Sequence, residues 1–496
     1  FDLLLRLARK KARPRISERP VTLLTPFLSL RQGLIPETAN RSVDSAFAVL
    51  SCYTAPAPLW ETEILPARTD GYKPEILDNA LSAARLLWFG AGKERIGFCT
   101  PEKLELVWDG VLDESRIKQG EPDMEALRII GTFCGRFRDF WEIRDELARA
   151  GLVEDSQGSH GTAAELLWEA VWSSLISSDS FQAIRRGLEQ GFNPQAPMPK
   201  SIRQRLTGDI PGLTPRYAPR SFRRSRSVPR ALREKWREGA PVPGNWFSLL
   251  SEPENALDIP QDDLDVLRTK QSGGILGEPR INQDGVPADV FSALEETELN
   301  RDRIRLLLRR WGILAKPFFE REQPAFSWSA LLPAMRRMEL SGELVTGRFL
   351  EGIHSLQFAS PAIAAELEAA EAVSAVYWMN AADPASPAGL AVDGLDGRLP
   401  PRTTGARLCF RGADLIAVST KNGRELEIFV PRDDKNYGEI IAFIKAPRTR
   451  ACHPLRKLVI ETINGQNAAA SPWADPLTAA GFTADRGRLF LWSAFP

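Results

Sequence analysis

The first clear pattern along the chain is three helical segments followed by two short apolar runs. A helical period over residues 43–53, a short apolar turn at 60–66 and a proline-started segment from Pro74 predict three helices. Residues 85–90 and 95–99 then predict two strands around a glycine-containing turn. Three helices followed by a β-hairpin is the element order of a winged helix.

The same order recurs twice further along the chain. Residues 124–133, 139–149 and 162–172 predict the three helices of a second module. Residues 301–311 and 328–340 predict the first and third helices of another, which continues into a predicted hairpin. Because one pattern returns three times, the sequence predicts tandem modules of one fold.

From about residue 373 the pattern changes to short apolar runs bounded by Gly, Pro, Asp and Asn. The predicted strands are 373–379, 406–411, 415–419, 425–430, 458–463 and 489–492, with a helix at 437–443 among them. Many short strands with turn signals predict a small β-barrel or sandwich. The fold class is therefore predicted as α+β, with tandem winged-helix domains followed by a C-terminal β-barrel-like domain.

These patterns set the predicted domain boundaries. The segments are a basic arm or linker at 1–42, winged helix 1 at 43–115, winged helix 2 at 120–194, a basic Pro/Gly/Arg-rich linker or excursion at 195–295, winged helix 3 at 296–370 and the β-barrel-like domain at 371–496. A length of 496 residues supports several domains, at about 100–200 residues each. Since the first residue is Phe1, we expect a piece of a longer protein.

The overall charge is balanced, with 64 Lys and Arg against 64 Asp and Glu. A neutral chain with locally clustered arginine is compatible with nucleic-acid binding, because the local potential governs the contact. Five cysteines without CxxC spacing indicate a reducing compartment, and we expect a cytoplasmic, nucleoid-associated protein. The adjacent Cys452 and His453 have the wrong spacing for structural zinc, and no metal site is expected.

The strongest electrostatic signal is the arginine-rich excursion. Guanidinium groups neutralise phosphates, and aromatic faces stack on unpaired bases. The alternative is a solvated linker whose aromatic side chains dock onto neighbouring domains. The predicted nucleic-acid contacts in this segment are Arg216, Arg220, Arg223, Arg224, Arg226, Arg230 and Trp246.

The third module carries a basic edge. A winged helix places its third helix in a groove and its wing on the nucleic-acid backbone. The predicted contacts in this module are Arg303, Trp328, Arg336, Arg337 and Arg348. The alternative for each module is a winged helix that only packs against its neighbours, and the acidic third helix of the second module, with Glu165 and Glu169, favours this role there.

An ATPase motor is not expected in this segment. A phosphate-binding loop needs GxxxxGK[ST], because backbone amides cradle the phosphates and a hydroxyl residue holds magnesium. The nearest stretch ends at Lys93 and Glu94, so that Glu94 replaces the hydroxyl residue, and Leu87 stands where the first glycine belongs. We therefore expect this segment to bind no cofactor.

Several stretches of the chain resemble the large helicase-related (Lhr) family in its long bacterial form, and they follow one another in family order. They are WETEILPAR at 60–68, YKPEILD at 72–78, LWFGAG at 87–92, LWEAVW at 167–172, SDSF at 178–181, RWGI at 310–313, RFLEG at 348–352, QFA at 357–359, ADPASP at 382–387, AGF at 480–482 and RGRL at 486–489. Residues 338–341, before the third wing, depart from the family pattern, and the first forty or so residues match it poorly.

The resemblance implies a longer protein with an N-terminal superfamily-2 motor, an ATP-dependent 3′–5′ DNA helicase that uses ATP and Mg. It also implies that winged helices and a β-barrel are arranged here as in AlkZ-type DNA glycosylases. The implied function of this segment is to bind single-stranded or damaged DNA beside the motor, in DNA repair. Its implied partners are therefore DNA and the motor of the same polypeptide.

Two alternatives stay open. The resemblance implies that a uracil-type DNA glycosylase is housed in this region. From their positions in the sequence, Asp383, in a loop just after a predicted strand, and Asp485, near the C-terminus, are the candidates for an acid that acts on a flipped-out base. A turn-forming role is the simpler explanation of each aspartate. The other alternative is an oligomerisation module that makes the parent helicase a homo-oligomer.

Overall fold

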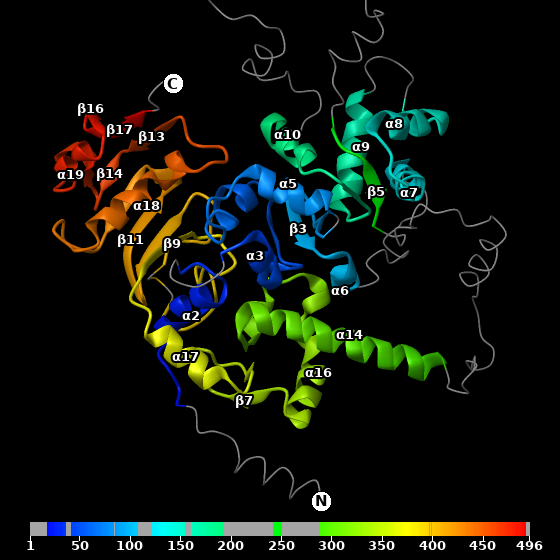
Figure 1. Ribbon diagram of the computed structural model, residues 1–496, viewed down its shortest axis with the longest axis horizontal. Coiled ribbons are helices and arrows are strands. Elements are labelled where there is room, and N and C mark those ends of the chain that lie inside the picture. Colours follow the sequence, from blue (N-terminus) through cyan, green and yellow to red (C-terminus); the bar gives the residue numbers. More distant parts are fainter. Residues whose placement is uncertain are drawn as a thin grey trace, which may run out of the picture. The chain divides into compact units, whose positions relative to one another are not determined.

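The computed structural model describes residues 17–35, 41–83, 85–107, 122–153, 160–192, 242–249, 288–395, 397 and 399–492. The chain divides into two compact units (Figure 1). Unit 1 contains the described residues of Phe1–Ile76, Phe98–Asp109 and Arg268–Pro496, and unit 2 those of Leu77–Gly97 and Gly110–Leu267.

The third predicted module is a winged helix within unit 1. Its elements are α14 (Ala288–Trp311), β6 (Ile313–Leu314), α15 (Lys316–Phe319), α16 (Trp328–Ser341), β7 (Val345–Gly347) and β8 (Gln357–Ala359). The three strands form an antiparallel sheet in the order β6-β8-β7. The Ser327 hydroxyl accepts from the Ala330 amide at the start of α16, and Gly342 ends the helix with φ +85°. The predicted helices and hairpin are confirmed here.

The first module has the predicted element order. It contains α3 (Val43–Leu50), β1 (Thr54–Pro56), α4 (Ala57–Leu59), the π-helical turn Trp60–Ile64, α5 (Pro74–Ser82), β2 (Leu87–Gly90), β3 (Arg95–Cys99) and α6 (Leu104–Val107). The sheet order is β1-β3-β2. Trp60 is fully buried, and its ring centroid lies 4.8 Å from that of Phe98 and 6.1 Å from that of Phe47. Large rings at helical and strand positions therefore form this core.

A helix occupies part of the segment that the sequence predicts as a basic arm. The helix α2 (Leu24–Arg31) follows a short 3₁₀ turn and contacts α14 and α17 (Ile363–Glu371). Leu24, Phe27 and Leu28 are buried. The prediction of an arm or linker over 1–42 is therefore wrong for α2, because residues 24–29 are buried on every side of the helix, as in a core helix and not in a solvated arm.

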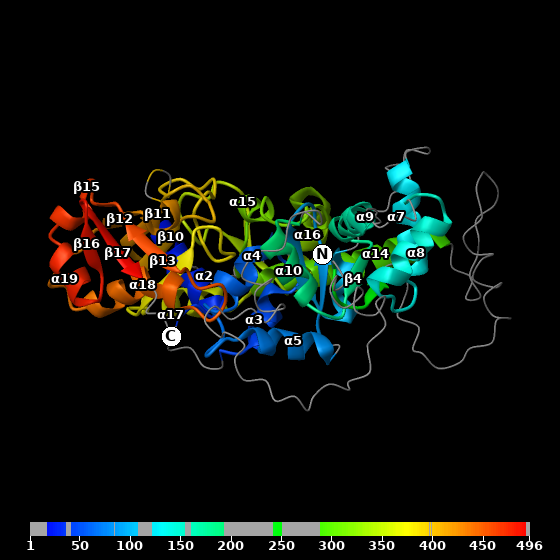
Figure 2. The same cartoon turned by 90° about the horizontal axis from the view of Figure 1, so that it is seen from above.

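The C-terminal part of unit 1 contains two sheets. The first has the order β15-β14-β12-β11-β10-β9, and the second has the order β13-β17-β16. The strands are β9 (Val376–Asn380), β10 (Arg407–Arg411), β11 (Asp414–Thr420), β12 (Glu425–Ile428), β13 (Lys457–Ile460), β14 (Thr462–Ile463), β15 (Gln466–Asn467), β16 (Thr483–Asp485) and β17 (Arg488–Trp492). Both sheets lie beside α18 (Tyr437–Thr449) in Figures 1 and 2, and α19 (Ala474–Ala479) contacts β16 and β17.

The predicted β-barrel is not confirmed. Within the described residues, β9 and β15 are the two edges of the longer sheet and do not pair with each other. The core between the strands and α18 is apolar and includes Ile440, Phe443, Leu458 and Ile460. The predicted strands and helix of this region are confirmed. A closed barrel would also require the two edge strands to pair with each other, and the sequence pattern of short strands does not determine that pairing.

Unit 2 contains most of the second predicted module. Its elements are α7 (Pro122–Phe133), α8 (Phe140–Arg149), α9 (His160–Trp172), β4 (Ile176–Ser178), α10 (Gln182–Gln190) and β5 (Trp246–Ser248). Asp139 begins α8 with a capping box to Glu142. Gly90 lies in this unit against the end of α9, where a Cβ atom would come within 1.9 Å of the Val171 carbonyl oxygen. The glycine of LWFGAG therefore permits a close backbone approach.

The strand β5 corrects the predicted linker at 195–295. It pairs antiparallel with β4, so that Trp246 faces Ser178. Trp246 is fully buried, and its ring centroid lies 6.1 Å from those of Trp88 and of Trp168. This part of the segment is therefore core structure. No helix in the part of the chain that the structure describes combines the length and apolar character that a membrane span requires.

Candidate functional site

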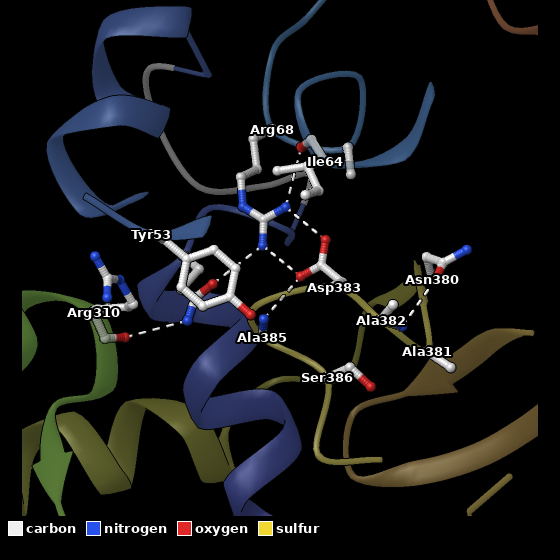
Figure 3. Close-up of polar contacts among 12 residues, drawn as sticks. Tyr53, Ile64, Arg68, Arg310, Asn380, Ala381, Ala382, Asp383, Ala385 and Ser386 are labelled. Carbon is white, nitrogen blue, oxygen red and sulfur yellow. Dashed lines mark hydrogen bonds and ion pairs between the residues drawn. The ribbon is translucent and has the colours of Figure 1, made fainter. Parts of the chain in front are cut away.

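Two of the stretches that carry the family resemblance meet in unit 1 (Figure 3). Arg68, which follows the π-helical turn, donates from Nη1 to Asp383 Oδ2 at 2.8 Å and from Nη2 to Asp383 Oδ1 at 2.7 Å. Each side chain is 1% exposed. Arg68 also donates to the Ile64 carbonyl at 3.1 Å and to Gln32 Oε1 at 3.2 Å. The pair is a buried, two-point ion pair with its remaining hydrogen bonds largely satisfied.

Asp383 lies in the loop that follows β9. Its Oδ1 also accepts from the Ala385 amide at 2.8 Å. In the same loop, Asn380 Oδ1 accepts from the Ala382 amide at 2.9 Å. A carboxylate placed in this way fixes both the loop and the first module. A reaction at Asp383 would need the pair to open, because its oxygens accept from Arg68 and from the loop backbone.

Two further arginines hold the same loop. Arg402 donates to the carbonyls of Ala382 at 2.8 Å and Asp383 at 3.0 Å, and to the Tyr53 hydroxyl at 3.0 Å. Arg321 donates to the carbonyl of Ala388 at 2.6 Å. Burial, and then the neighbouring charge of Arg402, lower the pKa of Arg321 to about 9. Three guanidinium groups therefore hold the loop that carries Asp383, and neither Arg321 nor Arg402 had a signal in the sequence.

The stretch RWGI forms a second buried polar cluster. Arg310 and Trp311 both donate to Glu322, Trp311 from Nε1 at 2.7 Å. The side chains of Arg310 and Glu322 are 0% exposed, and the Arg310 guanidinium lies 5.2 Å from the Tyr53 ring centroid. Gln32 Nε2 donates to the Arg310 carbonyl at 3.3 Å, and Gln32 also accepts from Arg68. The two clusters are therefore linked through Gln32.

The stretch WETEILPAR supplies two more paired carboxylates, of which Glu61 is buried and Glu63 is 12% exposed. Glu61 accepts from the Tyr72 hydroxyl at 2.9 Å. Glu63 pairs with Arg407 at 3.2 Å and with Arg450 at 3.1 Å. The family-like residues of this segment thus make internal contacts, and they bring residues 60–68 to the β9–β10 region of unit 1.

The predicted nucleic-acid contacts fall into three groups. Arg216, Arg220, Arg223, Arg224, Arg226 and Arg230 lie outside the described residues. Trp246 and Arg303 are 0% and 4% exposed, and Arg303 donates to the Leu106 carbonyl at 2.9 Å and to Asn300 at 3.2 Å. The prediction that these two side chains contact nucleic acid is corrected, because both serve the core of their unit.

The third group lies on α16 and its wing. Arg336 is 52% exposed, pairs with Glu339 at 3.0 Å and lies 5.5 Å from the Phe358 ring centroid. Arg337 is exposed, and Arg348 at the wing is 69% exposed, with Glu18 at 3.5 Å. Trp328 is half-buried, with its ring centroid 5.1 Å from that of Phe319. Three arginines of the predicted set are therefore open to solvent.

The arginines of α14 are more strongly neutralised. Arg301 and Arg305 pair with Glu343 at 2.7 and 3.0 Å, and each pairs with a second carboxylate on α14 itself. Arg309 is exposed. The described residues therefore show a local basic face at α16 and the wing, and not an unbroken positive track along the unit.

The second aspartate predicted as a catalytic acid lies elsewhere. Asp485 is exposed, at the end of β16, and it faces Arg488 across the turn to β17. The structure does not bring it to Asp383, which is buried in the loop after β9. The described His, Cys, Asp and Glu side chains form no group of three or more that could hold a metal ion.

Comparison with known proteins gives a consistent picture. Residues 20–101 and 293–379 match the models of two winged-helix domains, the third and the fourth, of the large helicase-related protein. An Lhr helicase/uracil glycosylase of Escherichia coli (strain K12) is 23% identical over 511 residues, which cover 95% of this chain and 28% of that protein. An Lhr helicase/probable uracil glycosylase of Mycolicibacterium smegmatis is 23% identical and is covered over 23% of its length. The chain thus spans about a quarter of each relative.

One solved structure, the DNA glycosylase AlkZ of Streptomyces sahachiroi, is 12% identical, with a TM-score of 0.46. The similarity covers 87% of this chain and 97% of that one. A similarity of this size shows neither how the domains of this chain are arranged nor what activity the chain has. The AlkZ-like arrangement of domains stays a prediction.

Proposed function

We propose, on the premise that this chain belongs to the large helicase-related (Lhr) family, that it is a DNA-binding part of a longer helicase. The observation that carries the proposal is the winged helix of residues 293–379, whose third helix α16 keeps Arg336 and Arg337 at its surface. A third helix enters a groove or lies along a strand, and the wing contacts the backbone. The exposed Arg348 lies at that wing.

The contacts in this proposal are mainly to phosphates. Arginines that reach phosphates fix the protein on DNA without reading its sequence. The Arg336–Glu339 pair is half open to solvent, so that a phosphate can compete with the carboxylate for the guanidinium at little cost. We therefore expect little base specificity, with single-stranded or damaged DNA as the ligand in a repair process.

The rest of the proposed helicase lies outside this chain. The motor, with its ATP and Mg, belongs to the remaining three quarters of a protein of the relatives' length. The partners in this proposal are DNA and that motor, and the location is the nucleoid of the cytoplasm. The family names of the relatives and the winged helices support it.

The experiment tests the basic face directly. We expect the full chain with Arg336, Arg337 and Arg348 changed to alanine to bind single-stranded DNA at least about tenfold more weakly near 0.1 M salt, with a salt slope smaller by about two. A matched variant changes Arg424, Arg432 and Lys435, which are exposed in the C-terminal part of unit 1, and should bind as the unchanged chain does. An equal loss of affinity for single-stranded DNA in both variants, or no loss in either, would contradict the proposal.

A second candidate function is base excision, and the observation that raises it is the uracil glycosylase in the names of both relatives. A carboxylate would activate water or stabilise the sugar cation after the base is flipped out. The exposed Asp485 is open to such a substrate, whereas Asp383 is closed by Arg68. Incubation with uracil-containing DNA should then give alkali-labile sites that Asp485→Asn removes, and a chain that gives no such sites lacks the activity.

A further inference from the structure

The small sheet β13-β17-β16 of unit 1 has one apolar face toward the core and one face toward solvent. Leu458, Ile460 and Leu489 are buried in the core between this sheet and α18. Side chains alternate across a strand, so Lys457 and Trp492, which are partners in the β13–β17 register, share the opposite face. The aromatic residues of that face are therefore not required by the core.

Two aromatic rings stand next to each other on this outer face. Phe490 and Trp492 are two residues apart on β17, with ring centroids 6.3 Å apart and planes inclined by 18°. Lys457 Nζ lies 4.3 Å from the Phe490 centroid and 4.2 Å from the Trp492 centroid. One ammonium group and two nearly parallel rings thus form a single surface feature, which we call the aromatic face.

Exposure distinguishes Trp492 from every other tryptophan that the structure describes. Trp492 is 58% exposed, whereas the other described tryptophans are buried or half-buried. An indole left in water forgoes the burial of a large apolar surface. An exposed indole beside a second ring and a cation is therefore open to a ligand.

The charges around the aromatic face are mainly positive. Lys457 and Arg488 lie on the strands, Arg456 precedes Lys457, Arg486 lies two residues before Arg488, and all four side chains are exposed. Arg488 has Glu461 at 3.5 Å in a pair that is partly open to solvent. Asp485, in β16, is the carboxylate of the β16–β17 hairpin. A polyanion with flat apolar groups complements such a surface.

We propose that the aromatic face binds single-stranded DNA, with unpaired bases stacked on Trp492 and Phe490 and phosphates held by Lys457 and Arg488. The inference rests on the proposed DNA-binding function and adds a second, separate contact to the basic face of α16. Stacking on aromatic side chains tolerates any base but requires that the base is unpaired. The site therefore gives the chain a preference for single strands over duplex.

The test compares single-stranded and duplex binding in the full chain. Trp492→Ala and Phe490→Ala should each weaken the binding of an oligo-dT strand about 5- to 100-fold, and duplex binding should change less than twofold. Trp492→Phe keeps a stacking ring and should retain most of the affinity. Phe429 is another exposed aromatic residue of the same unit, at 54%, and Phe429→Ala is the matched control that should bind as the unchanged chain does.

A second measurement locates the contact. A dT strand with one 5-iodouracil should crosslink on irradiation to the peptide that contains Phe490 and Trp492, and Trp492→Ala should abolish that crosslink. If the chain binds single-stranded DNA while the Trp492 and Phe490 variants bind equally well and the crosslink maps elsewhere, the inference is overturned and the proposed function stands. If the unchanged chain binds neither single strands nor duplex, both are overturned.

Discussion

The guanidinium of Arg68 and the carboxylate of Asp383 form a buried two-point ion pair, although 315 positions separate them in the chain. Arg68 comes from the first winged-helix module, and Asp383 from the loop after β9. Taking charges out of water is costly, and the cost is offset only when the geometry is good and the remaining lone pairs are satisfied. The contacts to Gln32 and the Ala385 amide satisfy most of these groups here, and Arg68 Nε is the buried atom of the pair that is left without a hydrogen bond.

Removing one partner of this pair should destabilise unit 1 strongly. We expect Asp383→Ala and Arg68→Ala each to lower the free energy of unfolding by about 3–5 kcal/mol, because each leaves a buried charge without its partner. The double variant should lose less than the sum of the two. Urea titration followed by tryptophan fluorescence measures this. Glu425→Ala, which removes the partly exposed partner of Lys421, should stay within about 0.5 kcal/mol of the unchanged chain.

Gly312 should tolerate alanine much less well than Gly342. Both have positive φ, +68° and +85°, but a Cβ on Gly312 would lie 2.5 Å from Phe27 Cζ, whereas a Cβ on Gly342 has open space. We expect Gly342→Ala to cost about 1–2 kcal/mol from the backbone alone. Gly312→Ala should cost about 1–3 kcal/mol more, because the Phe27 ring must move. Equal melting temperatures for the two variants would show that the contact between α2 and the winged helix is loose.

The buried thiols should make the fold less stable in alkali. Burial raises the pKa of Cys134 and of Cys409 to about 12. Between about pH 9 and pH 12 the unfolded chain loses these protons while the folded chain keeps them, so stability is full below pH 9 and falls as the pH rises. Each thiol contributes a slope of about 1.4 kcal/mol per pH unit. Unfolding free energies at pH 8 and pH 10.5 should differ less in the Cys134→Ala, Cys409→Ala variant than in the unchanged chain.

Trp246 should matter for folding and not for direct contact with DNA. Trp246→Ala should destabilise unit 2 by about 3–5 kcal/mol, since it removes a fully buried ring that packs on Trp88 and Trp168. Trp246→Phe refills most of the space and should bind single-stranded DNA with unchanged affinity. A loss of affinity in a folded Trp246→Phe variant would restore Trp246 as a contact.

The local pattern of the sequence determined the elements and the module order. The periods at α3, α9 and α16, the helix-ending Gly342 and the run of short strands after residue 373 are local signals, and local signals decide whether a segment is helix or strand. The resemblance in stretches such as WETEILPAR and RWGI pointed to the family that the two winged-helix matches support.

Only the tertiary structure decided which distant residues contact each other and which side chains are left exposed. Arg303 and Arg348 look alike in a sequence, yet one is buried against the Leu106 carbonyl and the other is 69% exposed at the wing. Only its buried ion pair with Arg68 distinguishes Asp383 from a surface turn residue. Lys457 lies beside Trp492 only because of the β13–β17 register. Contacts between distant segments depend on packing and register, which no local period encodes.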